Sequence, residues 1–231
     1  MDTAKHEEPK SLSHKISALL RKGRVPLLVL AGITFAAVAA IAVVTAVGDS
    51  TKQAAALGMS GLTNDAQAWS KETDTIKKAD LEKALVPALD ALAAKWPKSV
   101  QAQQALAIKA EIAESKKDWA EVEKIWLDAA TRLPGSFIAP VALQNAARAA
   151  EEQGADDRAK VHYMTFVDKY SGDSSGIAHA WFALGRIAEG TKDWPSALAA
   201  YDKIAANWPS SDWTKLAKDR IISMKSRGLV K

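Results

Sequence analysis

Histidine is the residue type in this sequence best suited to metal binding or to proton transfer near neutral pH. The chain has four: His6, His14, His162 and His179. A metal site needs several His, Cys, Asp or Glu side chains at suitable spacings. No two of these histidines have such a spacing, and no cluster of acidic residues completes a site. We therefore expect no metal centre, and we interpret His162 as a surface or packing residue.

The chain contains no cysteine, which excludes disulfides, thiol nucleophiles and thiolate-bound metals. It also lacks a phosphate-binding glycine loop and the Gly-x-Ser-x-Gly turn of serine hydrolases. The serines between Ser171 and Ser175 lie in a turn-rich stretch and are interpreted as loop residues. The sequence thus predicts a protein that is not an enzyme and that holds no cofactor.

Charge is distributed unevenly along the chain. The net charge is +4, yet the residues before Val25 hold six Lys or Arg against three Asp or Glu, which leaves +1 for the rest. A nucleic-acid-binding domain would need basic residues concentrated on one face. We therefore expect no nucleic-acid partner.

Val25 to Val47 forms an uncharged apolar run between Arg24 and Asp49, long enough to cross a bilayer as a helix. Lys and Arg are concentrated before this run, which predicts a cytoplasmic N-terminus. A cleaved signal peptide is the alternative, but its apolar region is usually shorter. We expect an uncleaved anchor in the inner membrane, with residues 1–24 as a cytoplasmic tail and the C-terminal domain in the periplasm. Ser11 to Lys22 reads equally as an amphipathic helix on the membrane surface or as a solvated basic tail.

A pattern of spaced residues near the end of the chain predicts a pair of helices. In it Trp181, Leu184, Gly185 and Ala188 precede Ala197, Tyr201, Ile204 and Pro209, as in a helix–turn–helix unit. The second half recurs upstream as Val122, Trp126, Ala129 and Pro134, and as Ala159, Tyr163, Phe166 and Ser171. Residues 64–211 are thus expected to form about four repeats, after a linker or helix start over 48–63 and before a capping helix over 212–231.

The repeats differ in quality. The first is the weakest, because its first helix, roughly Thr51 to Ile76, is polar and Pro87 interrupts its second helix. Small residues at Ala110, Ala147 and Gly185 are expected where two helices cross closely. Asp118 and Asp193 are expected to cap the second helices of their repeats, and Asp212 the last helix. Trp126, Trp181 and Trp213 fall at core positions.

These motifs resemble the tetratricopeptide repeat family over about Trp69 to Met224, most strongly in the last repeat. The resemblance implies an all-α chain in which a single transmembrane helix precedes a solenoid of helical hairpins. The layout is similar to membrane-anchored extracytoplasmic repeat proteins of bacteria, in particular the YfgM class beside the secretion machinery. It implies protein binding as a scaffold or chaperone-like factor. A structural subunit of a large membrane or envelope complex is the alternative.

The resemblance also implies which residues face a protein partner, since such arrays bind through the inner face of their first helices. Position by position, the transferred residues are Gln104, Ala107, Glu111, Glu114, Gln144, Arg148, Glu151, His179, Phe182, Arg186 and Glu189. Glu111, Arg148 and Arg186 stand where the family's carboxylate clamp would have Asn, so binding of a chaperone's C-terminal tail is not expected. A solvated surface with no partner is the other interpretation of this face.

Overall fold

The computed structural model describes residues 48, 50–171 and 174–231. The expected basic tail and the Val25–Val47 span lie outside the described residues. The chain divides into two compact units, residues 1–53 and 54–231, and the second is described here. Its described residues contain helices and turns but no strand. None of the described helices has both the length and the apolar character that a bilayer span requires.

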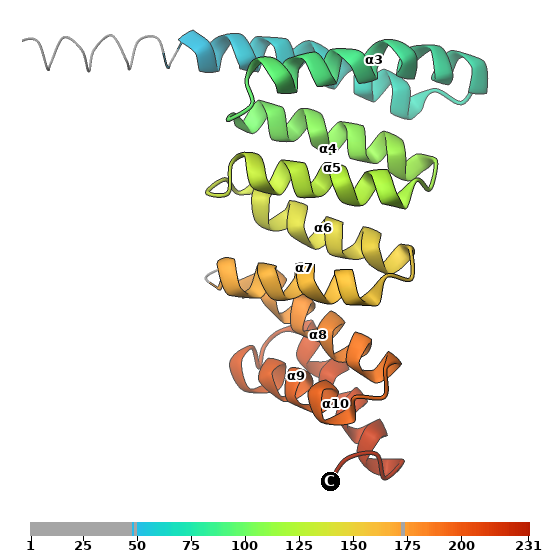
Figure 1. Ribbon diagram of the computed structural model, residues 1–231, viewed down its shortest axis with the longest axis vertical. Helices are drawn as coiled ribbons and strands as arrows, with labels where there is room; N and C mark the ends of the chain where they lie inside the picture. The colour runs from blue at the N-terminus through green and yellow to red at the C-terminus, as the bar shows by residue number, and fades with distance from the viewer. Residues whose placement is uncertain (1–47, 49, 172–173) are drawn as a thin grey trace, which may run out of the picture. The chain divides into compact units, whose positions relative to one another are not determined.

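Helices joined by short turns make up the second unit (Figure 1). A helix that ends at residue 71 comes first. It is followed by α3 (Thr75–Lys95), α4 (Val100–Ser115), α5 (Trp119–Arg132), α6 (Ile138–Glu152), α7 (Asp156–Lys169), α8 (Ser174–Gly190), α9 (Trp194–Asn207) and α10 (Asp212–Ser226).

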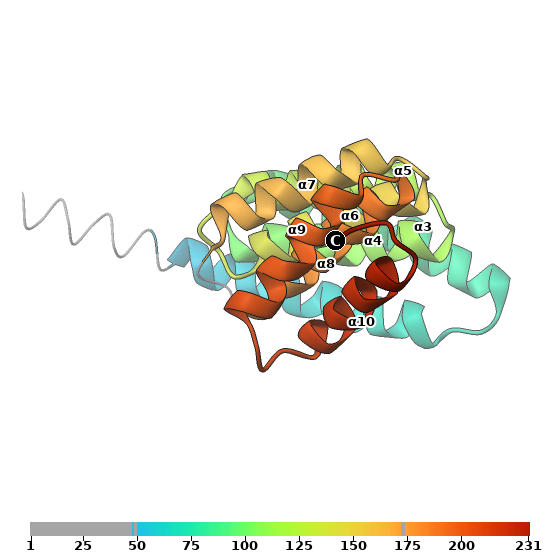
Figure 2. The same cartoon turned by 90° about the horizontal axis from the view of Figure 1, so that it is seen from below.

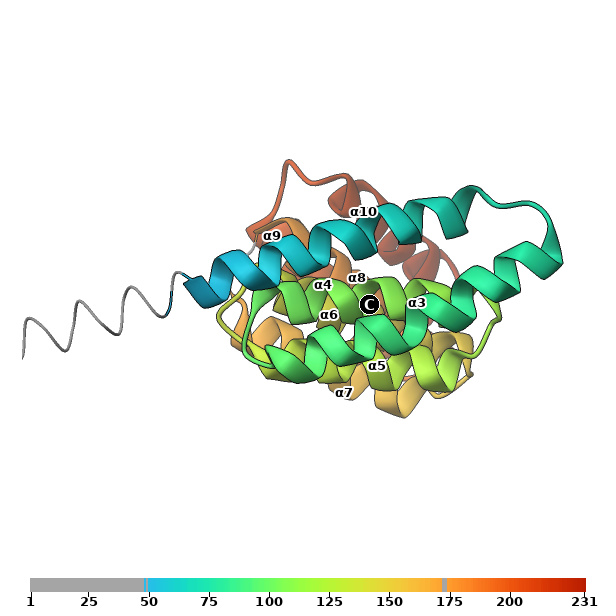
Figure 3. The same ribbon diagram turned by 90° about the horizontal axis from the view of Figure 1, so that it is seen from above.

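Each helix packs against the next, so the chain forms a stack of hairpins. Seen from above, α3 lies beside the helix that precedes it (Figure 3). We call α4, α6, α8 and α10 the A helices and α5, α7 and α9 the B helices. Seen along the stack, α5 and α7 lie on one side and α10 on the opposite side (Figure 2). The A helices α4, α6, α8 and α10 contact one another in that order.

Small residues allow the A and B helices of a hairpin to cross closely. Ala110, Ala147 and Gly185 are buried on the A helices, as the sequence predicted. A Cβ built on Gly185 would lie 2.5 Å from Cε1 of Tyr201, closer than real Cβ atoms approach a neighbour. The large side chains of Tyr163 and Tyr201 on the B helices are fully buried, and that of Tyr201 lies against Gly185.

The turns inside the hairpins share one conformation. Lys117, Gly154 and Lys192 all have φ near +60° (59°, 67° and 61°) and end their A helices in the left-handed region. Asp118 and Asp193 then cap α5 and α9, because their carboxylates accept hydrogen bonds from the backbone N–H of Glu121 and Ser196 at 3.2 Å. Both capping predictions are confirmed.

The first hairpin differs from the sequence-based expectation in its boundaries. The first helix ends at residue 71 rather than at Ile76, because Asp74 accepts hydrogen bonds from the N–H of Ile76 and Lys77 and starts α3. Pro87 does not interrupt α3. Pro87 and Lys83, whose carbonyl loses its helical partner, are both exposed, so water can replace the missing hydrogen bond.

The capping residue of α10 was also predicted wrongly, by one position. The hydroxyl of Ser211, not the carboxylate of Asp212, accepts the hydrogen bond from the N–H of Trp213 at 3.3 Å. Asp212 is the first residue of α10, where its negative charge favours the helix N-terminus.

Candidate functional site

The residues that the sequence assigned to partner binding lie on the A helices. Counting from Gly185 and its equivalents, His179 shares one position with Gln104, Val141 and Trp213, and Phe182 shares the next with Ala107, Gln144 and Leu216. Arg186 corresponds to Glu111, Arg148 and Arg220, and Glu189 to Glu114 and Glu151. We call the surface made by these positions the A-helix face.

Ion pairs connect neighbouring A helices across this face. The side chain of Arg148 pairs with Glu114 at 2.7 Å, that of Arg186 with Glu151 at 2.5 Å, and that of Arg220 with Glu189 at 3.7 Å. Each pair joins the Glu position of one A helix to the Arg position of the next. We call these three pairs the ion-pair row. Arg148 and Arg186 were expected to be exposed contacts for a partner, and each is already paired within the chain.

The environment of the row changes the acidity of several groups. Burial alone would lower the pKa of Arg186, but the hydrogen bond and charge of Glu151 outweigh it and raise the pKa. Partial desolvation of the carboxyl by its neighbours, and then the charge of Glu114, raise the pKa of Glu111. Burial, and then a 2.6 Å hydrogen bond to Glu189, raise the pKa of Tyr201. The raised pKa values keep Arg186 protonated and Tyr201 neutral at neutral pH.

Aromatic side chains gather at the C-terminal end of the A-helix face. The ring of Trp213 on α10 lies 4.6 Å from the ring of His179 and 5.2 Å from that of Phe182, measured between centroids. His179 Nδ1 lies 3.4 Å from Oε1 of Gln144. Burial lowers the pKa of His179, so the ring is neutral near pH 7. Helix α10 therefore covers part of the surface expected to be open at His179 and Phe182.

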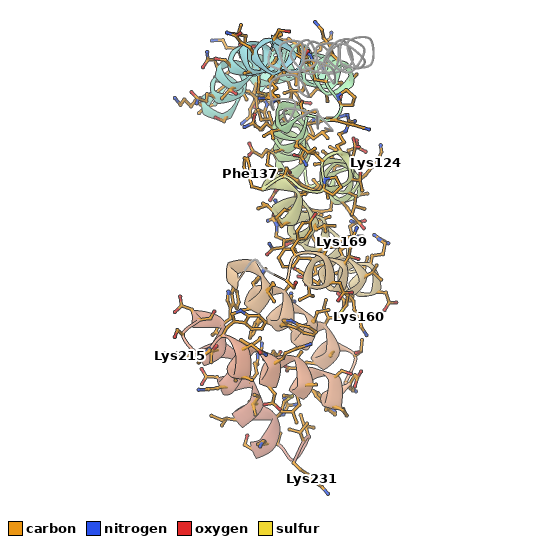
Figure 4. The ribbon with its side chains drawn as sticks, turned by 90° about the vertical axis from the view of Figure 1, so that its left-hand side faces the viewer. Lys124, Phe137, Lys160, Lys169, Lys215 and Lys231 are labelled. Atoms are coloured by element: carbon orange, nitrogen blue, oxygen red, sulfur yellow. The ribbon has the colours of Figure 1, made fainter. Side chains whose placement is uncertain are left out.

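Apolar side chains remain exposed on the same side of the stack. Phe137, at the start of α6, is 73% exposed, Val141 on α6 49% and Leu216 on α10 45%. Phe137 and Lys215 project to one side, whereas Lys124 and Lys160 on the B helices project to the other (Figure 4). The A-helix face thus combines the ion-pair row with exposed apolar groups.

The structure brings most of the predicted residues together. Arg148, Glu151, Arg186 and Glu189 belong to the row, and Gln144, His179 and Phe182 to the aromatic end. Gln104 and Glu111 lie exposed on α4. Sequence reasoning missed Val141, Trp213, Leu216 and Arg220 as members of the face. The sequence signal for the row is that Arg and Glu stand three residues apart on both α6 and α8, but the pairing also depends on the register of neighbouring A helices.

A second polar cluster lies away from this face, between α5 and α7. Glu123 is buried and accepts hydrogen bonds from Arg158 Nη2 at 3.2 Å and from Gln153 Nε2 at 2.7 Å. His162 Nε2 lies 2.8 Å from its other oxygen. His162 is therefore part of a polar network rather than a simple packing residue. Among the described residues, no group of His, Asp and Glu is arranged to hold a metal ion.

Comparison with known proteins supports the repeat architecture. Residues 179–211, from α8 through α9 to the cap of α10, match the family model of the tetratricopeptide repeat. This segment is thus similar to a tetratricopeptide repeat. The match falls on the repeat whose sequence pattern was the strongest, and such repeats are generally protein-interaction modules without enzymatic activity.

A relative carries the same description. The chain is 28% identical over 148 residues to a "TPR repeat-containing protein" of Treponema pallidum (strain Nichols). The match covers 64% of this chain and 61% of the relative's length. The last hairpin and the relative thus agree on the repeat family that this chain resembles.

Proposed function

We propose that this protein is a membrane-anchored scaffold or chaperone-like factor of the bacterial cell envelope, which binds other proteins through its A-helix face. The observation that carries the proposal is the exposure of Phe137, Val141 and Leu216 beside the ion-pair row. Exposed apolar groups next to ordered charges suit a protein partner, because burying the apolar area stabilises a complex while the charges select its orientation. The uncharged run Val25 to Val47 supports the anchor.

Replacing two apolar residues of the face should weaken partner binding. The variant Val141→Lys/Leu216→Lys keeps the fold, since both side chains are about half exposed. Truncating a residue at the centre of an interface costs roughly 1–2 kcal/mol or more, and each 1.4 kcal/mol is about tenfold in affinity. We expect at least a tenfold loss in the amount of partner protein cross-linked to the full chain in membranes, measured by quantitative mass spectrometry.

The control is Ile76→Lys/Val161→Lys, which places the same charges at still more exposed apolar positions on α3 and α7. It should recover partners as the wild type does. Equal recovery with the A-helix variant would remove this face from the proposal.

The proposed topology has its own test, which uses the absence of native cysteine. Ser210→Cys, at an exposed position before α10, should react in intact cells with a thiol reagent that reaches the periplasm but cannot cross the inner membrane. Ser11→Cys should react only after the cells are lysed, because basic residues hold this end in the cytoplasm. Labelling is read by mass shift on a gel, and the reverse pattern would overturn the proposed orientation.

A further inference from the structure

A groove of about 690 Å³ runs between α7 and α9. Its floor is formed by Trp181, Leu184 and Ala188 of α8, with Met164 on one wall and Ala199 on the other. The sequence placed Trp181 in the core, but it is only half-buried. The groove is therefore a mainly apolar surface open to solvent.

Side chains bridge the corresponding gap one repeat earlier. There Glu123 of α5 is joined to Arg158 and His162 of α7. Counted from the buried aromatic residues Trp126, Tyr163 and Tyr201, which share one position on the B helices, the equivalent residues of the next gap are Lys160, Ser196 and Ala200. These three residues cannot form the same network, and two of them are small. The groove is open because of these substitutions in the repeat pattern.

The charged residues of the groove favour an acidic ligand. Lys160 lies on the α7 wall and Lys203 on the α9 wall, against a single acidic lining residue, Asp202. The ammonium of Lys203 lies 4.0 Å from the ring centroid of Trp181, where a cation is attracted by the aromatic face. An apolar floor between two cationic walls suits an apolar chain that carries carboxylates.

The geometry points to a docking site in this groove for a segment of a partner protein with two or three large apolar side chains and acidic residues at both ends. The lining of α9 extends from Ser196 to Asn207, roughly 16 Å at 1.5 Å per helical residue, which about five extended residues span. The site lies on the B-helix side, since Lys160 projects away from the side of Phe137 and Lys215 (Figure 4). It is thus separate from the A-helix face and adds a second binding surface to it.

The test uses two fluorescent peptides, Glu-Leu-Ser-Phe-Ser-Leu-Glu and the same peptide with Lys at both ends. In an extended peptide the three apolar side chains point to one side. Fluorescence anisotropy with the full chain in lipid nanodiscs, corrected with empty nanodiscs, measures both affinities. We expect the acidic peptide to bind at least tenfold more tightly, and Lys160→Gln/Lys203→Gln to remove most of this difference. Equal affinities, or no binding by either peptide, would overturn the proposal.

Two variants assign the binding to the groove. Lys160→Glu/Ser196→Arg/Ala200→His transfers the network of the α5–α7 gap, and Ala199→Trp fills the groove from an exposed position on its wall. Each variant should lower the affinity for the acidic peptide at least tenfold. Val141→Lys/Leu216→Lys, on the A-helix face, should bind the acidic peptide with the affinity of the wild type. The opposite result would move the site to the A-helix face. Self-association of the wild type that both groove variants abolish would make a second copy the occupant and would also refute the proposal.

Discussion

Gly185→Leu should lower the thermal stability of the protein strongly. A Cβ at this position would lie 2.5 Å from Cε1 and 2.7 Å from Cζ of Tyr201. Tyr201 cannot move away easily, because it is fully buried and its hydroxyl is hydrogen-bonded to Glu189 at 2.6 Å. Overpacking typically costs about 1–3 kcal/mol and occasionally more, and we expect the upper end here. For a domain of this size that corresponds to a Tm lower by roughly 6–12 °C, measured by circular dichroism.

Gly190→Leu is the matched control for this prediction. Gly190 ends the same helix, and a Cβ there would meet no atom within 4 Å. The Tm of the Gly190→Leu variant should therefore stay close to that of the wild type. The double variant Gly185→Leu/Tyr201→Ala should lose less stability than the two single changes added together, since the smaller residue makes room for the leucine. Full additivity would show that the predicted clash with Tyr201 does not occur.

The crossing at Gly185 illustrates what the sequence was able to predict. Residues whose role is decided within one hairpin follow from local spacing, because helix periodicity and turn length already place them together. Thus Gly185 was correctly assigned to a tight helix crossing, and Asp118 and Asp193 to helix caps. Ser211 and Asp212 are neighbours and both residue types can cap a helix, so spacing alone did not show which of them caps α10.

Contacts between hairpins were harder to predict. The pairing of Arg186 with Glu151 requires that successive A helices lie side by side in a known register, which no single hairpin reveals. The cover that Trp213 provides over His179 and Phe182 requires the direction in which α10 leaves the last turn. The A-helix face was therefore predicted as a set of positions, while the contacts that its members make with one another were not.

The hydrogen-bonded network around Glu123 also joins two hairpins, and the sequence did not predict it. The network has a measurable effect on stability. Burial would raise the pKa of the Glu123 carboxyl, but hydrogen bonds from Arg158, His162 and Gln153 outweigh burial and hold its pKa below the usual value near 4.5. The side chain of Glu123 is only 10% exposed, whereas that of Arg158 is 54% exposed and partly screened by water. The stabilisation therefore comes mainly from hydrogen bonds to a buried charge rather than from the ion pair.

Glu123→Gln should lower the free energy of unfolding by about 1.5–3 kcal/mol at pH 7, the usual range for hydrogen bonds to a charged group. Because the pKa of Glu123 is lower in the folded state, its contribution is complete above the unfolded value and is lost as pH falls through the folded value. The difference between wild type and variant, measured by urea unfolding, should therefore shrink as the pH falls below about 4.5. Glu121→Gln, on the same helix but paired with the exposed Lys124, should cost less than about 1 kcal/mol. A loss at Glu123 that stays constant with pH would mean that packing, not the carboxylate charge, holds α5 and α7 together.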